Sequence, residues 1–145
     1  MPDTTSIDMT AERERVEAAR IERELSQNRA SLAYLNGQAD DHDSRAIRMR
    51  QLAAELVQHV QPLRTLFTDL RQLHTPHTWE GRAATASRLR LDEHEIRHNA
   101  AVQRIDHLID DLEDQARWHA GQSTELDMQI GRVRSAIWTL EQQRR

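Results

Sequence analysis

The pattern with the clearest chemical meaning is HEIRH, residues 94–98. In zinc peptidases, two histidines at this spacing bind the metal and the glutamate polarises zinc-bound water. A catalytic zinc also needs a third protein ligand and a dry cleft. The surrounding residues are charged on nearly every side, and Arg97 lies inside the motif. We therefore predict a solvated helix with His98 on or near a helix seam, with no catalytic residue, no metal site and no cofactor. Adventitious metal binding by His94 and His98 is the alternative.

Composition and charge argue against several classes of protein. The 145 residues include 20 basic residues, all Arg, and 24 acidic residues, for a formal net charge of −4, so we expect no nucleic-acid partner. The absence of Cys excludes disulfides and thiolate metal sites. No apolar run approaches the roughly 18 residues that span a membrane, and the first 20 residues contain no apolar core typical of a signal peptide. We interpret the exclusive use of Arg as codon bias of a GC-rich bacterial genome.

The helical elements that would carry these residues are clear from periodicity. With 4 Gly, 3 Pro and 3% aromatic residues, the chain lacks the turn and strand formers of a sheet, which predicts an all-α fold. Apolar residues recur at alternating steps of three and four, typical of a heptad seam. Members of the seam include Ala18, Ile21, Leu25, Leu56, Val60, Leu63, Phe67 and Leu70 in the first half, and Ile105, Ile109, Leu112, Ile130, Val133, Ile137 and Leu140 in the second.

Two weak interruptions leave the architecture open. Asn36-Gly37 reads as a helix C-cap, and HAGQS at residues 119–123 is a weaker break. These breaks predict one domain over 1–145, with a flexible N-terminus at 1–7 and helices at about 8–36, 43–74, 80–118 and 123–143. Either a long antiparallel hairpin bends at the breaks, or its distal halves fold back into a four-helix bundle. Pro62 should start a new helix or kink an existing one.

The strongest break is central, at residues 74–78, and Trp79-Glu80-Gly81 follows it. Thr78 can cap the next helix, Trp79 can cover the end of the seam, and Gly81 allows close approach of another group. A helix, a Trp-x-Gly turn and a second helix resemble the WXG100 superfamily of type VII secretion. The resemblance covers about half the chain and implies a folded, exported helical hairpin that partners larger secreted toxins. The family's export signal, a Tyr four residues before an acidic residue, has no clear match, because Tyr34 precedes the turn and is followed four residues later by Gln38.

These observations predict a non-enzymatic helical partner or targeting subunit of type VII secretion, which binds the helical region of a larger secreted effector or pairs with itself. It would be secreted by a signal-peptide-independent route, or be cytoplasmic before export. A cytoplasmic or phage-type coiled-coil structural protein is the alternative. The predicted hairpin seam is Leu56, Val60, Leu63, Phe67, Leu70, Ile105, Ile109 and Leu112. The predicted partner-binding residues are Leu52, Leu66, Leu73, Ile130, Val133, Ile137, Trp138 and Leu140.

Overall fold

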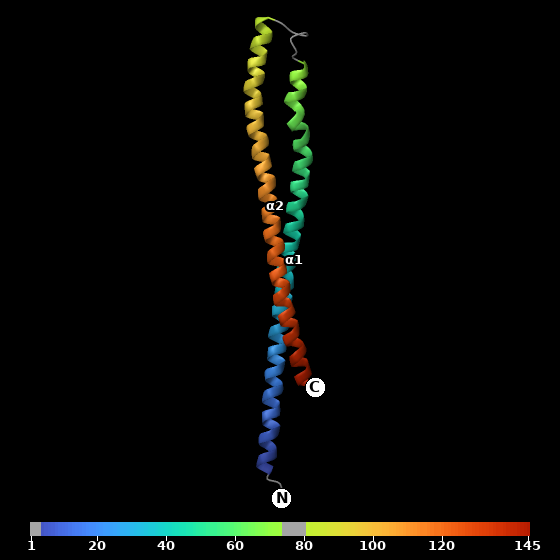
Figure 1. The fold of residues 1–145 in the computed structure, drawn as a ribbon. Coiled ribbons are helices and arrows are strands. Elements are labelled where there is room, and N and C mark those ends of the chain that lie inside the picture. Colours follow the sequence, from blue (N-terminus) through green and yellow to red (C-terminus); the bar gives the residue numbers. More distant parts are fainter. Residues whose placement is uncertain (1–3, 74–80) are drawn as a thin grey trace. The chain divides into compact units, whose positions relative to one another are not determined.

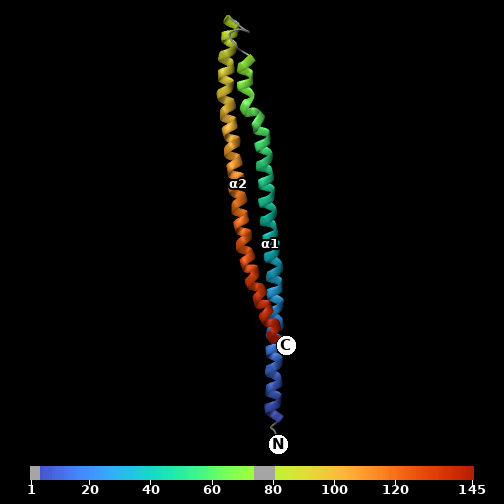
Figure 2. The same ribbon diagram turned by 45° about the vertical axis from the view of Figure 1, so that its right-hand side comes forward.

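A computed structural model describes residues 4–73 and 81–145. They form two long helices, α1 (Thr4–Leu73) and α2 (Arg82–Arg144), with no strand in either described range. The helices form a hairpin (Figure 1), which a second view also shows (Figure 2). The predicted all-α hairpin is therefore confirmed, and it follows from a chain rich in Ala, Leu, Arg, Glu and Gln, which are all strong helix formers.

The two predicted interruptions are absent, so the four-helix alternative is wrong. α1 runs through Asn36-Gly37, and α2 runs through Gly121. A glycine inside a helix costs about 1 kcal/mol relative to alanine. Around Gly37, the buried Ala39 and the half-buried Leu35 join an apolar cluster with α2. Burial on both sides of the glycine outweighs its cost, so the helix continues.

The helix ends also differ from the prediction. α1 begins at Thr4, so part of the expected flexible N-terminus is helical, and α2 begins at Arg82 rather than near residue 80. Pro62 lies inside α1 and does not start a new helix. It removes one backbone N–H, but it lies on the exposed side of the helix, where water can satisfy the carbonyl that loses its partner.

The described residues fall into two compact units, and each helix contributes to both. The turn unit contains residues 45–73 of α1 and 81–118 of α2, and the terminal unit contains residues 4–44 and 119–145. In the turn unit, Ala53, Val60, Val102 and Ile109 form the buried core. In the terminal unit there are two clusters, one around Ile21, Leu25 and Leu140, and one around Ala39, Leu126 and Ile130.

Neither described helix contains a segment long and apolar enough to cross a membrane. Apolar residues are spread along thin seams, and charged residues separate them. This spacing suits a helix pair and does not produce a continuous hydrophobic segment.

Candidate interaction surface

The seam between the helices follows one heptad phase on each. Writing its two inner positions as a and d, Ala53 and Val60 lie at a in α1, while Val102 and Ile109 lie at a in α2. Five predicted seam residues belong to the core of the turn unit: Leu56, Val60, Ile105, Ile109 and Leu112. Phe67 and Leu70, nearer the turn, are half-buried, and Leu63 is 37% exposed. The inner positions thus hold the two helices of this unit together.

Three residues assigned to an external partner are instead used inside the chain. Ile130 and Leu140 are buried, and Ile137 packs against the cluster that contains Leu140. The reason is that the C-terminal half of α2 has its own partner in the first half of α1. Val133 is half-buried, whereas Trp138 is 63% exposed. Of the predicted tail surface, only Trp138 is largely open to solvent.

One edge of the turn unit is closed by ion pairs. In an antiparallel helix pair, the e positions of the two helices face each other beside the seam, and the g positions do so on the other side. Arg64 and Arg71 occupy e positions of α1. Arg64 pairs with Asp106, and Arg71 pairs with Glu95 and, at 2.6 Å, with Asp92. We call this side the ion-paired edge. These contacts set the register of the two helices, although each exposed pair contributes only about 0–1 kcal/mol.

The terminal unit uses the same edge in the same way. Arg29 of α1 donates to Glu141 of α2 at 3.2 Å, and both occupy e positions. Arg144 pairs with Glu22 at 3.1 Å. The repeated placement of arginine and carboxylate on this side shows that it is built to face water, because such pairs need no further partner.

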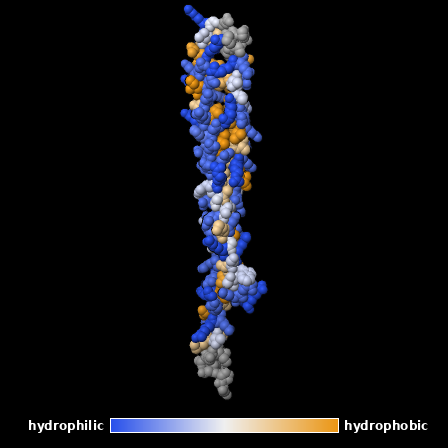
Figure 3. Space-filling view, viewed as in Figure 1, coloured by the Kyte–Doolittle hydropathy of each residue, from blue (hydrophilic) through white to orange (hydrophobic). Residues whose placement is uncertain are grey.

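The opposite edge of the turn unit has a different character. Its g positions in α1 are Leu52, His59, Leu66 and Leu73, and in α2 they are His94, Ala101, Leu108 and Gln115. None of the eight is Asp, Glu, Lys or Arg, in a chain that is 30% charged. The four leucines are 46%, 41%, 70% and 48% exposed in chain order, and we call them the leucine edge. In Figure 3, apolar side chains appear as orange patches on an otherwise mostly hydrophilic surface.

The leucine edge contains the predicted partner-binding residues Leu52, Leu66 and Leu73, together with one residue that the sequence reading missed. Leu108 lies on the other helix, and it joins the edge because the register brings the g positions of α1 and α2 together. The seven-residue spacing of positions 94, 101, 108 and 115 was visible in the sequence. Without the ion pairs that fix the register, however, nothing connected that row to the leucines of α1.

Polar residues interrupt the seam at defined places. In the terminal unit, His42 and His119 meet across it with their Nδ1 atoms 2.8 Å apart, and His119 is buried. Their rings are tilted by 39° with centroids 5.1 Å apart. Ser123, one turn beyond His119, is also buried. A directional contact of this kind is satisfied in one register only, so it helps to align the helices.

His98 of the HEIRH motif likewise serves the seam. Its Nε2 donates a hydrogen bond to the carbonyl oxygen of Leu63, and its ring lies 4.8 Å from that of Phe67. His94 is exposed on the outer side of the same helix. Over residues 4–73 and 81–145, no group of three or more His, Cys, Asp or Glu side chains is placed to hold a metal ion. The motif thus supplies a hydrogen bond to the hairpin in this structure.

At the central turn, Trp79 and Thr78 lie outside the described residues. Gly81 is the last residue before α2, where it has a φ of +107°. Its carbonyl oxygen accepts bonds from the Thr85 N–H at 3.0 Å and from Thr85 Oγ1 at 3.1 Å. Gly81 therefore caps α2 from outside the helix, rather than lying just inside it as expected. The positive φ is the physical reason for glycine at this position.

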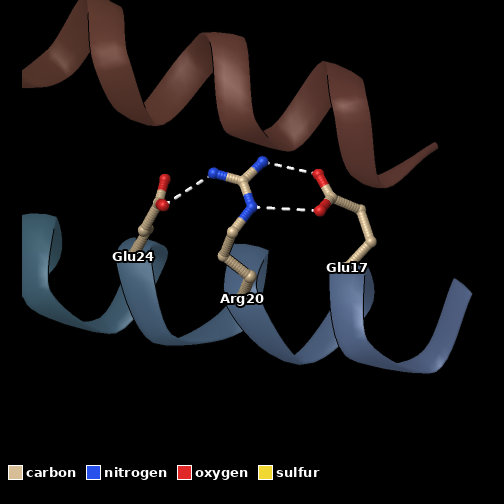
Figure 4. A network of polar contacts seen from close by, with 3 residues as sticks. All are labelled: Glu17, Arg20 and Glu24. Carbon is tan, nitrogen blue, oxygen red and sulfur yellow. Dashed lines mark hydrogen bonds and ion pairs between the residues drawn. The ribbon is translucent and has the colours of Figure 1, made fainter. Parts of the chain in front are cut away.

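A surface network in the terminal unit joins three residues on one face of α1. Arg20 lies between Glu17 and Glu24, donating to both, with a distance of 2.7 Å to Glu24 (Figure 4). The hydrogen bond from Arg20 lowers the pKa of Glu17, and the two carboxylates raise that of Arg20. All three are solvent-exposed, so the network supports the helix locally.

Comparison with protein families, with curated proteins and with solved structures finds no match.

Proposed function

We propose that this protein is a non-enzymatic helical partner subunit that binds a helix of another protein along the leucine edge. The observation that carries the proposal is the difference between the two edges of the turn unit. The ion-paired edge is complete within one hairpin, whereas the leucine edge exposes large apolar side chains from both helices. An a/d stripe is sufficient for a helix pair, and an additional apolar g position is typical of helices that pack against further helices.

The chemistry of recognition is that of an amphipathic helix in a groove. Fully burying a leucine contributes roughly 1.5–3 kcal/mol, so covering a half-exposed one contributes about 1 kcal/mol. Leu52, Leu66 and Leu108 are each 41–48% exposed and would supply the centre of the interface. A binding helix with apolar residues at i, i+3, i+4 and i+7 matches this surface.

In the setting that the WXG100 resemblance implies, the binding helix belongs to a larger secreted effector of type VII secretion. The effector carries the export signal, and this chain leaves the bacterial cell with it. What supports this setting is the combination of a long helical hairpin, a glycine at the start of α2 and the absence of a clear Tyr-based signal. The leucine edge supports helix binding independently of the secretion route.

Co-purification with the product of the neighbouring gene tests the proposal. Leu66→Asp places a charge in the leucine edge and should reduce recovery of the bound protein at least tenfold. Val57→Asp is the matched control, because Val57 is 38% exposed, against 41% for Leu66, but lies at an e position on the ion-paired edge. It should leave recovery unchanged. Equal recovery with the two variants, or no loss with Leu66→Asp, would contradict the proposal.

A further inference from the structure

The charged residues that border the leucine edge differ between the two helices. Heptad position c lies next to g on the outer side, so c residues form the rims of the leucine edge. On α1 the rim runs through Glu55, Pro62 and Asp69, and on α2 it runs through Arg90, Arg97 and Arg104. One rim is acidic and the other basic. All three arginines and both carboxylates are exposed.

Neither Asp69 nor Arg97 forms an ion pair with another described residue. The two lie at the same level along the hairpin, because Arg71 pairs with Glu95 and the helices run in opposite directions. They are separated by the width of the leucine edge, so they do not satisfy each other. A surface with an apolar centre, one acidic rim and one basic rim is complementary to a copy of itself.

We propose that a second copy of this chain covers the leucine edge, with the two-fold axis parallel to the helices, so that α1 of each copy faces α2 of the other. In this arrangement the leucines of both copies form a shared core, and Asp69 meets the partner's Arg97 twice, once on each side. The contact is isologous and closes on itself, as most homodimers do.

The charges also select the orientation. If the two-fold axis ran across the helices, α1 would face α1, and the two acidic rims would meet. In the parallel arrangement, opposite charges meet over residues 62–69 of one copy and 97–104 of the other. Farther from the turn, Glu55 lies level with the partner's Asp111, so the matched stretch ends there. The favourable pairs thus lie in the half of the interface that is nearest the turn.

The inference rests on the proposed function, since it names the occupant of the same edge. The homodimer is the form of the free protein, and a partner helix would replace the second copy. Both states cover the same leucines, so leucine substitutions alone cannot distinguish them, whereas the rim charges can.

Sedimentation equilibrium of the full-length chain tests the second copy directly. We expect a dimer for the wild type, and a dissociation constant raised about tenfold by Asp69→Arg or by Arg97→Asp, because each substitution creates two like-charge contacts per dimer. Combining both substitutions should restore the wild-type dissociation constant, because the pair is then reversed. Circular dichroism should show unchanged helicity, since both residues are exposed. A wild-type monomer, or a double variant no tighter than the single ones, would overturn the dimer.

A distance measurement tests the orientation. The chain has no Cys, so Arg82→Cys takes a single spin label at the start of α2, next to the turn. In the parallel dimer both turns lie at one end, and the labels should be within about 30 Å of each other, roughly the width of a four-helix bundle. An antiparallel dimer centred on the leucine edge would place them about 65 Å apart at 1.5 Å per residue. That longer distance would overturn the parallel arrangement. A monomer that still loses its partner on Leu66→Asp would overturn the dimer and leave the proposed function standing.

Discussion

Leu25 offers the sharpest test of the packing in the terminal unit. Its side chain is fully buried in the cluster with Ile21 and Leu140. Leu25→Ala removes three carbons, which contribute about 0.8 kcal/mol each by transfer, and the cavity left behind adds to this. We expect a loss of about 3 kcal/mol in the free energy of unfolding. That is a large share of the roughly 7–15 kcal/mol typical of a chain of this length.

Urea denaturation followed by circular dichroism at 222 nm measures this loss, and the same change at an exposed leucine provides the control. Leu89 is 61% exposed and lies outside both the seam and the leucine edge. Leu89→Ala should change the free energy of unfolding by less than about 0.5 kcal/mol. The melting temperature of the Leu25→Ala variant should fall by about 10 °C. Equal effects of the two substitutions, or a loss below about 1 kcal/mol for Leu25→Ala, would refute the packing described for this cluster.

Three further outcomes are expected. Gly81→Ala should lower the free energy of unfolding by about 1–2 kcal/mol in thermal melts, because a φ of +107° is strained for alanine; unchanged stability would count against that backbone conformation. The pKa of Glu17 lies below its ordinary value of 4.5 because Arg20 donates to it, so the network's stabilisation is present above that value and is lost as pH falls through the lowered pKa. Carboxyl NMR titration should show the Glu17 pKa rising in Arg20→Gln, and an unchanged midpoint would argue against the contact. Alanine substitutions of His42 and His119 should show a coupling of about 0.5–1.5 kcal/mol in a double-mutant cycle, whereas additive losses would exclude the contact between their rings.

Much of the hairpin was predictable because its determinants are local and periodic. The heptad phase of residues such as Val60 and Ile109 identifies the seam without any knowledge of the partner helix. What periodicity cannot give is the balance between a local break and distant packing. Asn36-Gly37 has the composition of a helix end, but the helix continues because Leu35 and Ala39 pack against α2. Propensity here is about 1 kcal/mol, and several buried side chains outweigh it.

The candidate interaction surface was only half predictable for a related reason. Leu52 and Leu66 stand out on one helix because they recur seven residues apart beside the seam. Leu108 joins them only through the register of α1 against α2, which depends on contacts such as that of Arg64 with Asp106. The tail residue Ile130 was misassigned for the converse reason. An apolar stripe looks the same in sequence whether it meets its own chain or another.

The central claim is that another helix covers the leucine edge and leaves the ion-paired edge open. Single cysteines at positions 66 and 57 test it most directly, because the chain has no Cys and the native side chains are 41% and 38% exposed in a single hairpin. At micromolar protein concentration, we predict that a thiol reagent labels Val57→Cys at the rate of an exposed cysteine and Leu66→Cys at least tenfold more slowly. Dilution should reduce the difference. Equal labelling rates at all concentrations would contradict the claim.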